Sequence, residues 1–115
     1  MVPRAMIVFG CLMLLTACES KQAPTTALTP DLQAGKAVVE ANCVVCHKPG
    51  INGAPIIGNP KMWQRRIAQG QDVLVQHAID GYNYDMMPPR GGNPELSDND
   101  IRLAVAYLVS QVKDH

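Results

Sequence analysis

The feature that most constrains this chain is the stretch CVVCH at residues 43–47. Two cysteines three positions apart span nearly one helical turn, so Cys43 and Cys46 face the same way and His47 turns beneath them. This spacing is the pattern by which two sulfurs hold the vinyl groups of a haem while the imidazole offers a ring nitrogen to iron. The stretch therefore predicts a chain folded around one large apolar group.

Three other interpretations of the two cysteines are weaker. A redox-active pair is expected at a helix N-terminus, whereas this pair follows a predicted helix. A structural zinc site needs four ligands, and His77 and His115 do not have the spacing that would complete one. A disulfide between Cys43 and Cys46 would close a very short loop and add little stability.

Composition agrees with a bound group in the interior. The chain has 115 residues, enough for one domain, but only one Trp, three Tyr and one Phe. A domain of this size has a marginal core, and a large cofactor would fill it. Ten basic residues balance ten acidic ones, which argues against nucleic-acid binding.

Residues 1–17 are interpreted as an export signal, with Arg4 preceding a short apolar run. The run is shorter than the roughly 20 residues of a membrane-spanning helix. Its end, LTAC at residues 15–18, resembles a bacterial lipobox, which implies that Cys18 is lipidated and becomes the first residue; a plain signal-peptidase site is the alternative. Residues 18–29 then form a flexible tether, and residues 30–115 form the domain. We expect a periplasmic protein anchored to a bacterial membrane.

The pattern of the domain predicts an all-α fold of about four helices. Helices are expected from Pro30 into Cys43, from Pro60 to Gly70, over residues 71–80, and after a capping Ser97, where apolar residues recur at the helical period. Two loops rich in Gly and Pro, residues 47–60 and 82–94, separate them. Loops this long are expected to be ordered by packing on the shared group.

A second iron ligand is expected in the stretch DMMPPRGG. The prolines extend the backbone after Met87, which favours this thioether over that of the neighbouring Met86. His77 is the competing ligand.

The region from about Leu32 to Val112 resembles the class I cytochromes c, and within them the cytochrome c5 family. The matching runs are GKAVVEANCVVCHKPGINGAPIIGN, MWQRRIAQG, AIDGYN, MPPRGGNPELSD and AVAYL. The resemblance implies a cytochrome c fold around one haem c. It also implies haem attachment through the two cysteines, with His47 proximal and Met87 distal. The first and last helices would cross at Gly35 and Tyr107. Some members carry a Cys pair after the GG, where this chain has Asn93 and other residues.

Further residues are expected around the haem. Pro55 and Ile57 would pack on the His47 side, and a nearby carbonyl, such as that of Pro49, would hold the ring N–H of His47. Trp63 would pack at the haem edge with its N–H near a propionate, or serve as plain core. Arg65 or Arg66 would neutralise a propionate, or be solvated. Five basic residues either form a rim that attracts an acidic partner or are scattered, solvated charges: Lys48, Lys61, Arg65, Arg66 and Arg90.

These expectations together describe an electron carrier rather than an enzyme. With both axial positions filled, no small-molecule substrate is expected at the iron. The partners would be redox proteins of a respiratory chain, a membrane donor and a terminal oxidase or reductase. Two alternatives stay open: a permanently bound haem subunit of a larger oxidoreductase, and a haem sensor or enzyme with an open iron position.

Overall fold

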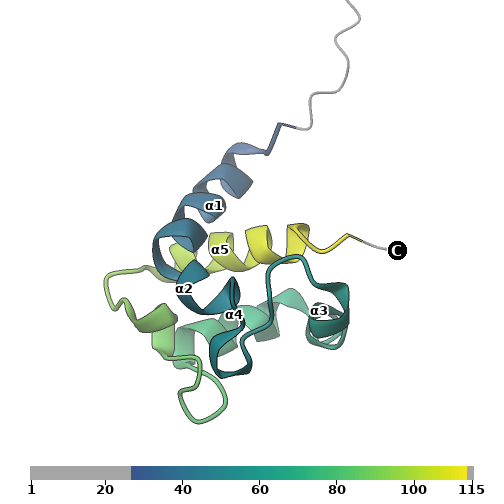
Figure 1. Ribbon diagram of the computed structural model, residues 1–115. Coiled ribbons are helices and arrows are strands. Elements are labelled where there is room, and N and C mark those ends of the chain that lie inside the picture. Colours follow the sequence, from purple (N-terminus) through teal and green to yellow (C-terminus); the bar gives the residue numbers. More distant parts are fainter. Residues whose placement is uncertain (1–26, 114–115) are drawn as a thin grey trace, which may run out of the picture.

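The computed structural model describes residues 27–113, so the expected export signal, Cys18 and most of the tether lie outside the described residues. The elements are α1 (Pro30–Asn42), α2 (Val44–His47), α3 (Pro60–Ile67), α4 (Gln71–Asp80) and α5 (Asp98–Ser110), with short 3-10 turns at Ile51–Gly53 and Pro89–Gly92 (Figure 1). The expected all-α class is confirmed.

The helices begin where the local sequence predicts. Thr29 accepts a hydrogen bond from the backbone N–H of Leu32, at 3.3 Å, and Asn59 accepts one from Met62, at 3.2 Å. A proline follows each of these caps, where its missing N–H costs nothing. Ser97 and Asp100 form a reciprocal capping box at the start of α5.

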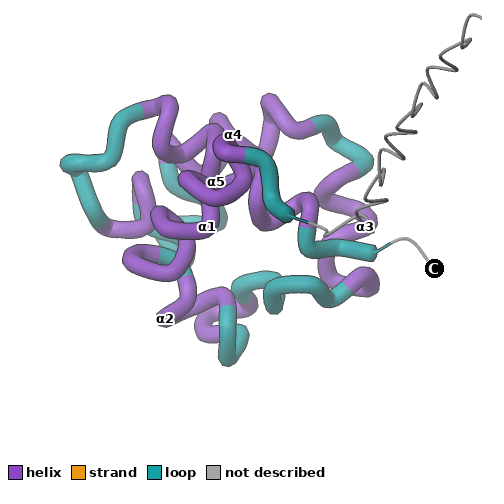
Figure 2. Tube along the Cα trace, turned by 90° about the horizontal axis from the view of Figure 1, so that it is seen from above, coloured by secondary structure: helices purple, strands orange, loops and turns teal. Residues whose placement is uncertain are grey.

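The structure adds one helix to the expected four. Cys43 ends α1, and a separate single turn, α2, begins at Val44 and ends at His47. The CVVCH stretch is therefore divided, with Cys43 at the end of α1 and its other four residues in α2. Seen from above, helical segments and loops alternate, and no strand is drawn in the described part of the chain (Figure 2). Within residues 27–113, no helix combines the length and apolar character needed to cross a membrane.

Helices α1 and α5 form the most extensive helix–helix contact (Figure 1). At their crossing, a Cβ added to Gly35 would lie 2.1 Å from the backbone oxygen of Leu103 and 3.1 Å from Cβ of Tyr107. Only glycine allows the two backbones to approach this closely. The crossing expected at Gly35 and Tyr107 is therefore present.

Two clusters of buried side chains make the core, and α5 contributes to both. The first cluster joins α1, α3 and α5 through Val39, Trp63, Ala104 and Leu108. The second joins α4 and α5 through Leu74, Ala78, Ile101 and Val105. Helix α5 therefore links the part of the core beside α1 and α3 to the part beside α4, against which Met87 packs.

Candidate functional site

His47 is a buried side chain, 7% exposed, with a defined tautomer. Its Nδ1 lies 2.9 Å from the carbonyl oxygen of Pro55. A carbonyl only accepts, so Nδ1 carries the proton and donates it, leaving a lone pair on Nε2. Burial lowers the pKa of His47 and the nearby Arg66 cation lowers it further, against the opposing effect of the Pro55 hydrogen bond. A neutral ring with a free Nε2 is the state that a metal requires.

The His47 loop is held by a second contact. The backbone N–H of Ile57 donates to the carbonyl of His47, at 3.0 Å. The carbonyl that orients the ring belongs to Pro55 rather than to Pro49. Together the two bonds close the loop after α2 back onto the histidine and fix the ring orientation.

Cys43 and Cys46 are both free thiols and partly buried. Burial raises the pKa of Cys43, and the neighbouring Cys46 raises it further. A raised pKa is the opposite of what a redox-active thiol pair needs. Among the described residues, no three His, Cys, Asp or Glu side chains gather in a metal-binding group, so a zinc site has no ligand set there.

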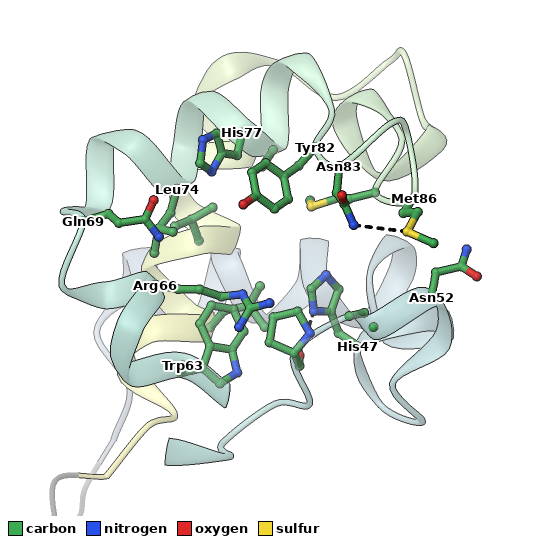
Figure 3. Close-up of a pocket in the computed structure, with 17 residues that line it drawn as sticks. His47, Asn52, Trp63, Arg66, Gln69, Leu74, His77, Tyr82, Asn83 and Met86 are labelled. Atoms are coloured by element: carbon green, nitrogen blue, oxygen red, sulfur yellow. Dashed lines mark hydrogen bonds between the residues drawn. The ribbon is translucent and has the colours of Figure 1, made fainter. Parts of the chain in front are cut away.

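A cavity of about 120 Å³ lies between the segment that follows His47 and the loop that carries Met87. Figure 3 shows His47, Trp63 and Arg66 on one side of it and His77, Tyr82 and Asn83 on the other. Apolar residues of α4 and α5 complete the wall: Leu74, Ala78, Val105 and Leu108. A largely apolar cavity with a few polar groups at its margin is typical of a cofactor site.

Met87 and Met86 both line the cavity, but their surroundings differ. Met87 is partly buried against the second core cluster, and it pairs with Tyr82 through two backbone hydrogen bonds of 2.9 and 3.2 Å. Met86 is 48% exposed, and its sulfur accepts a hydrogen bond from Asn83 at 3.1 Å (Figure 3). The turn closed by the Tyr82–Met87 hydrogen bonds, called here the Met87 hairpin, thus anchors Met87 and leaves Met86 at the margin of the cavity.

Arg66, and not Arg65, reaches the cavity. Consecutive helical residues point about 100° apart, so Arg65 faces solvent while Arg66 shares a face with Trp63. Arg65, expected beside the haem, therefore does not line this cavity, and Arg66 does. Of the five basic residues of the possible rim, Arg66 alone lines the cavity, and Arg90 forms an ion pair with Asp98.

Two other expected contacts are placed differently. The indole N–H of Trp63 donates to the carbonyl of Ile56 at 2.8 Å, so it is not free for a propionate. Ile57 packs against the first core cluster and is not among the cavity-lining residues, whereas Pro55 is. Both cysteines also lie outside the cavity wall, with Cys43 packed against the same cluster.

The sequence alone did not single out several cavity residues. Asn52, Gln69, Tyr82 and Asn83 all line it. The signal that could have found the last two is their position after the helix-ending Gly81, in the turn that leads to the methionines. His77, the expected rival ligand, also lines the cavity, with its ring centroid 4.3 Å from that of Tyr82.

Comparisons with known proteins agree on one group. Residues 30–108 match the family model described as cytochrome c oxidase, cbb3-type, subunit III. Cytochrome c-555 of Chlorobaculum thiosulfatiphilum is 47% identical over 85 residues, covering 72% of this chain and 99% of that protein. Cytochrome c5 of Ectopseudomonas mendocina is 36% identical over 73 residues, which cover 62% of this chain and 82% of that protein.

A solved structure has the same fold. The match is to a chain in the crystal structure of an electron transfer complex of nitrite reductase with cytochrome c, with a TM-score of 0.66 and 36% sequence identity. The match covers 76% of this chain and all of that one.

Proposed function

Because this chain belongs to the class I c-type cytochromes, electron carriers that hold haem c covalently, we propose that His47 and Met87 are its two iron ligands and that it serves redox proteins of a respiratory chain. The observation that carries this proposal is the cavity, bounded by the unprotonated ring nitrogen of His47 on one side and by the anchored Met87 hairpin on the other.

The residues present fit a haem attached through Cys43 and Cys46. Both thiols are free, they lie one helical turn apart beside His47, and the adjoining cavity is largely apolar. Bound haem supplies an iron that cycles between the ferric and ferrous states. A neutral thioether and a neutral imidazole in an apolar pocket favour the state of lower charge and raise the reduction potential.

The chain's own residues prepare this site in two ways. The Pro55 carbonyl keeps the His47 ring in one orientation and tautomer. Trp63, Val105 and Leu108 exclude water from the cavity wall. With His47 and Met87 both serving as ligands, no position would be left at the iron for a substrate, which supports electron transfer without other chemistry at the iron.

We propose that both the electron donor and the electron acceptor are proteins. The donor would be a membrane protein, and the acceptor a terminal oxidase or reductase. The similarity to a cytochrome in a complex with nitrite reductase supports a redox protein as acceptor. A periplasmic position, with Cys18 lipidated, is proposed from the apolar run and the LTAC stretch of the sequence.

A second candidate is a permanently bound subunit of a larger oxidoreductase, because the matching family model is described as an oxidase subunit. The c-555 relative favours a separate carrier, since the matched region accounts for 99% of that protein. Detergent extraction from native membranes tests the two: a carrier gives a small particle of one chain, and a subunit copurifies with larger proteins.

The ligand proposal is tested on protein matured with haem by comparing Met87→Ala with Met86→Ala. We expect the first variant to lose the weak far-red band of sulfur–iron bonding and to bind carbon monoxide when reduced. The second variant and the unaltered protein are expected to keep the band and to ignore carbon monoxide. Loss of the band in Met86→Ala alone would assign the ligand to Met86, and carbon monoxide binding by the unaltered protein would indicate an open-site haem protein.

A further inference from the structure

One side-chain hydrogen bond links the haem-attachment end of α1 to the loop that follows Met87. Nδ2 of Asn93 donates to Oδ1 of Asn42 at 2.8 Å, across 51 positions of sequence. Every other side-chain hydrogen bond recorded for residues 27–113 joins residues no more than eight positions apart. Among the described residues, this contact is therefore the one side-chain hydrogen bond that joins parts of the chain far apart in sequence.

Both ends of this link are rigidly held. Asn42 is the last residue of α1, directly before Cys43, and its own Nδ2 donates to the carbonyl of Val38 at 2.9 Å. Asn93 accepts a hydrogen bond from the backbone N–H of Glu95 at 3.1 Å and donates its backbone N–H to Arg90 at 3.2 Å. Both asparagines are partly buried, so the bond is shielded from competing water.

The rest of the loop is fixed from two other directions. Arg90 adopts a left-handed backbone conformation with φ of 55°, and its guanidinium donates to the Leu96 carbonyl and to Asp98 at the start of α5. At the other end, Met87 pairs with Tyr82. The loop is thus attached to α5 and to the turn that follows α4, and among residues 27–113 the Asn93 bond is its one side-chain hydrogen bond to α1.

We propose that Asn93, through Asn42, is a positioning residue that holds the Met87 loop at a set distance from the haem-attachment motif and so keeps the methionine on the iron. This inference rests on the proposed function, because it requires Met87 to be the ligand. The attachment point lies one residue beyond Asn42, so a shift of the loop relative to α1 is a shift of Met87 relative to the iron. Losing one such hydrogen bond is expected to favour displacement of the methionine by roughly three- to tenfold.

The experiment titrates imidazole into the ferric holoprotein, where it competes with Met87. Asn93→Ala and Asn42→Ala are each expected to raise imidazole affinity roughly three- to tenfold. The double variant is expected to gain no more than either single one, because the two side chains form one bond. If Asn93→Ala does not fold, Asn93→Asp removes the Nδ2 donor while keeping the oxygen that accepts from Glu95, and the same rise is expected.

Two control variants distinguish a positioning role of Asn93 from a general loss of stability. Thr29→Ala removes the cap at the opposite end of α1 and lowers stability there, yet is expected to leave imidazole affinity unchanged. Gln76→Ala removes the exposed hydrogen bond to Asp80 on α4 and is likewise expected to be neutral. If Thr29→Ala raised the affinity as much as Asn93→Ala, the role would be structural and the proposal would be overturned.

Failure of the inference is distinct from failure of the proposed function. If Met87→Ala strongly raises imidazole affinity while Asn93→Ala leaves it unchanged, the ligand is right and the positioning proposal is wrong. If Met87→Ala binds imidazole no better than the unaltered protein, the ligand assignment fails first and the positioning proposal falls with it.

Discussion

At the scale of single residues, the role of Trp63 depends on which group accepts the hydrogen bond from its indole N–H. Its ring lines the cavity, but its N–H is used by the Ile56 carbonyl. Trp63→Phe keeps an aromatic ring but removes one of the two hydrogen bonds that the Ile56 carbonyl accepts, the other coming from the backbone N–H of Asn59. We expect the free energy of unfolding to fall by about 0.5–1.5 kcal/mol in denaturant titrations, with the reduction potential unchanged. A shifted potential at unchanged stability would instead indicate that the N–H acts on the haem.

Arg65 and Arg66 form a matched pair for testing charge at the cavity. Arg66→Gln removes a cation from the cavity wall, which favours the ferric state because that state carries one more positive charge. We expect voltammetry to record a potential lower by about 30 mV, a small effect because Arg66 is partly exposed to solvent. Arg65→Gln, on the solvent face, is the control with no expected change. Equal shifts in both variants would contradict a specific role for Arg66.

At the scale of elements, the helices were predictable because their start signals are local. Thr29 and Asn59 cap the helices that begin with the following proline, and Ser97 caps α5, so three residues of sequence suffice to identify each start. The separate turn α2 was not predicted, because it depends on the backbone of Cys43 departing from the α1 helix.

The crossing of α1 and α5 rests on one missing side chain. Gly35→Ala places a methyl group 2.1 Å from the Leu103 oxygen, so the helices must separate. We expect the free energy of unfolding to fall by about 1–3 kcal/mol, despite alanine's higher helix propensity. Thermal and denaturant unfolding of the holoprotein measure this. Ala34→Ser, on the exposed side of α1, is the control, and an unchanged or raised stability in Gly35→Ala would mean that the crossing relaxes without cost.

At the scale of the whole molecule, the attachment motif and the methionine stretch were predictable because each is a short pattern with its own chemistry. The contacts around them were not. The choice between Arg65 and Arg66 depends on how α3 is rotated against the core, and the Asn42–Asn93 bond depends on two segments 51 positions apart meeting in space. Such contacts follow from the packed fold, which a single sequence does not display.

The packed fold itself depends on what fills its centre. Eight hydrophobic residues are buried among those described, in two clusters that share α5, and a cavity of about 120 Å³ adjoins them. A domain of this size has little other burial to offset the entropy of its ordered loops. A group that binds only the folded chain therefore contributes a large share of its stability.

Removing the attachment points tests this dependence. We expect the double variant Cys43→Ser and Cys46→Ser, produced without haem, to lose most of the helical circular dichroism of the holoprotein and to unfold without a cooperative thermal transition. Each single variant, matured with haem, retains one possible thioether and is expected to keep a cooperative transition at a lower temperature. A haem-free double variant that melted cooperatively near the holoprotein temperature would show that the two clusters suffice. The cavity would then be a feature of an independently stable scaffold.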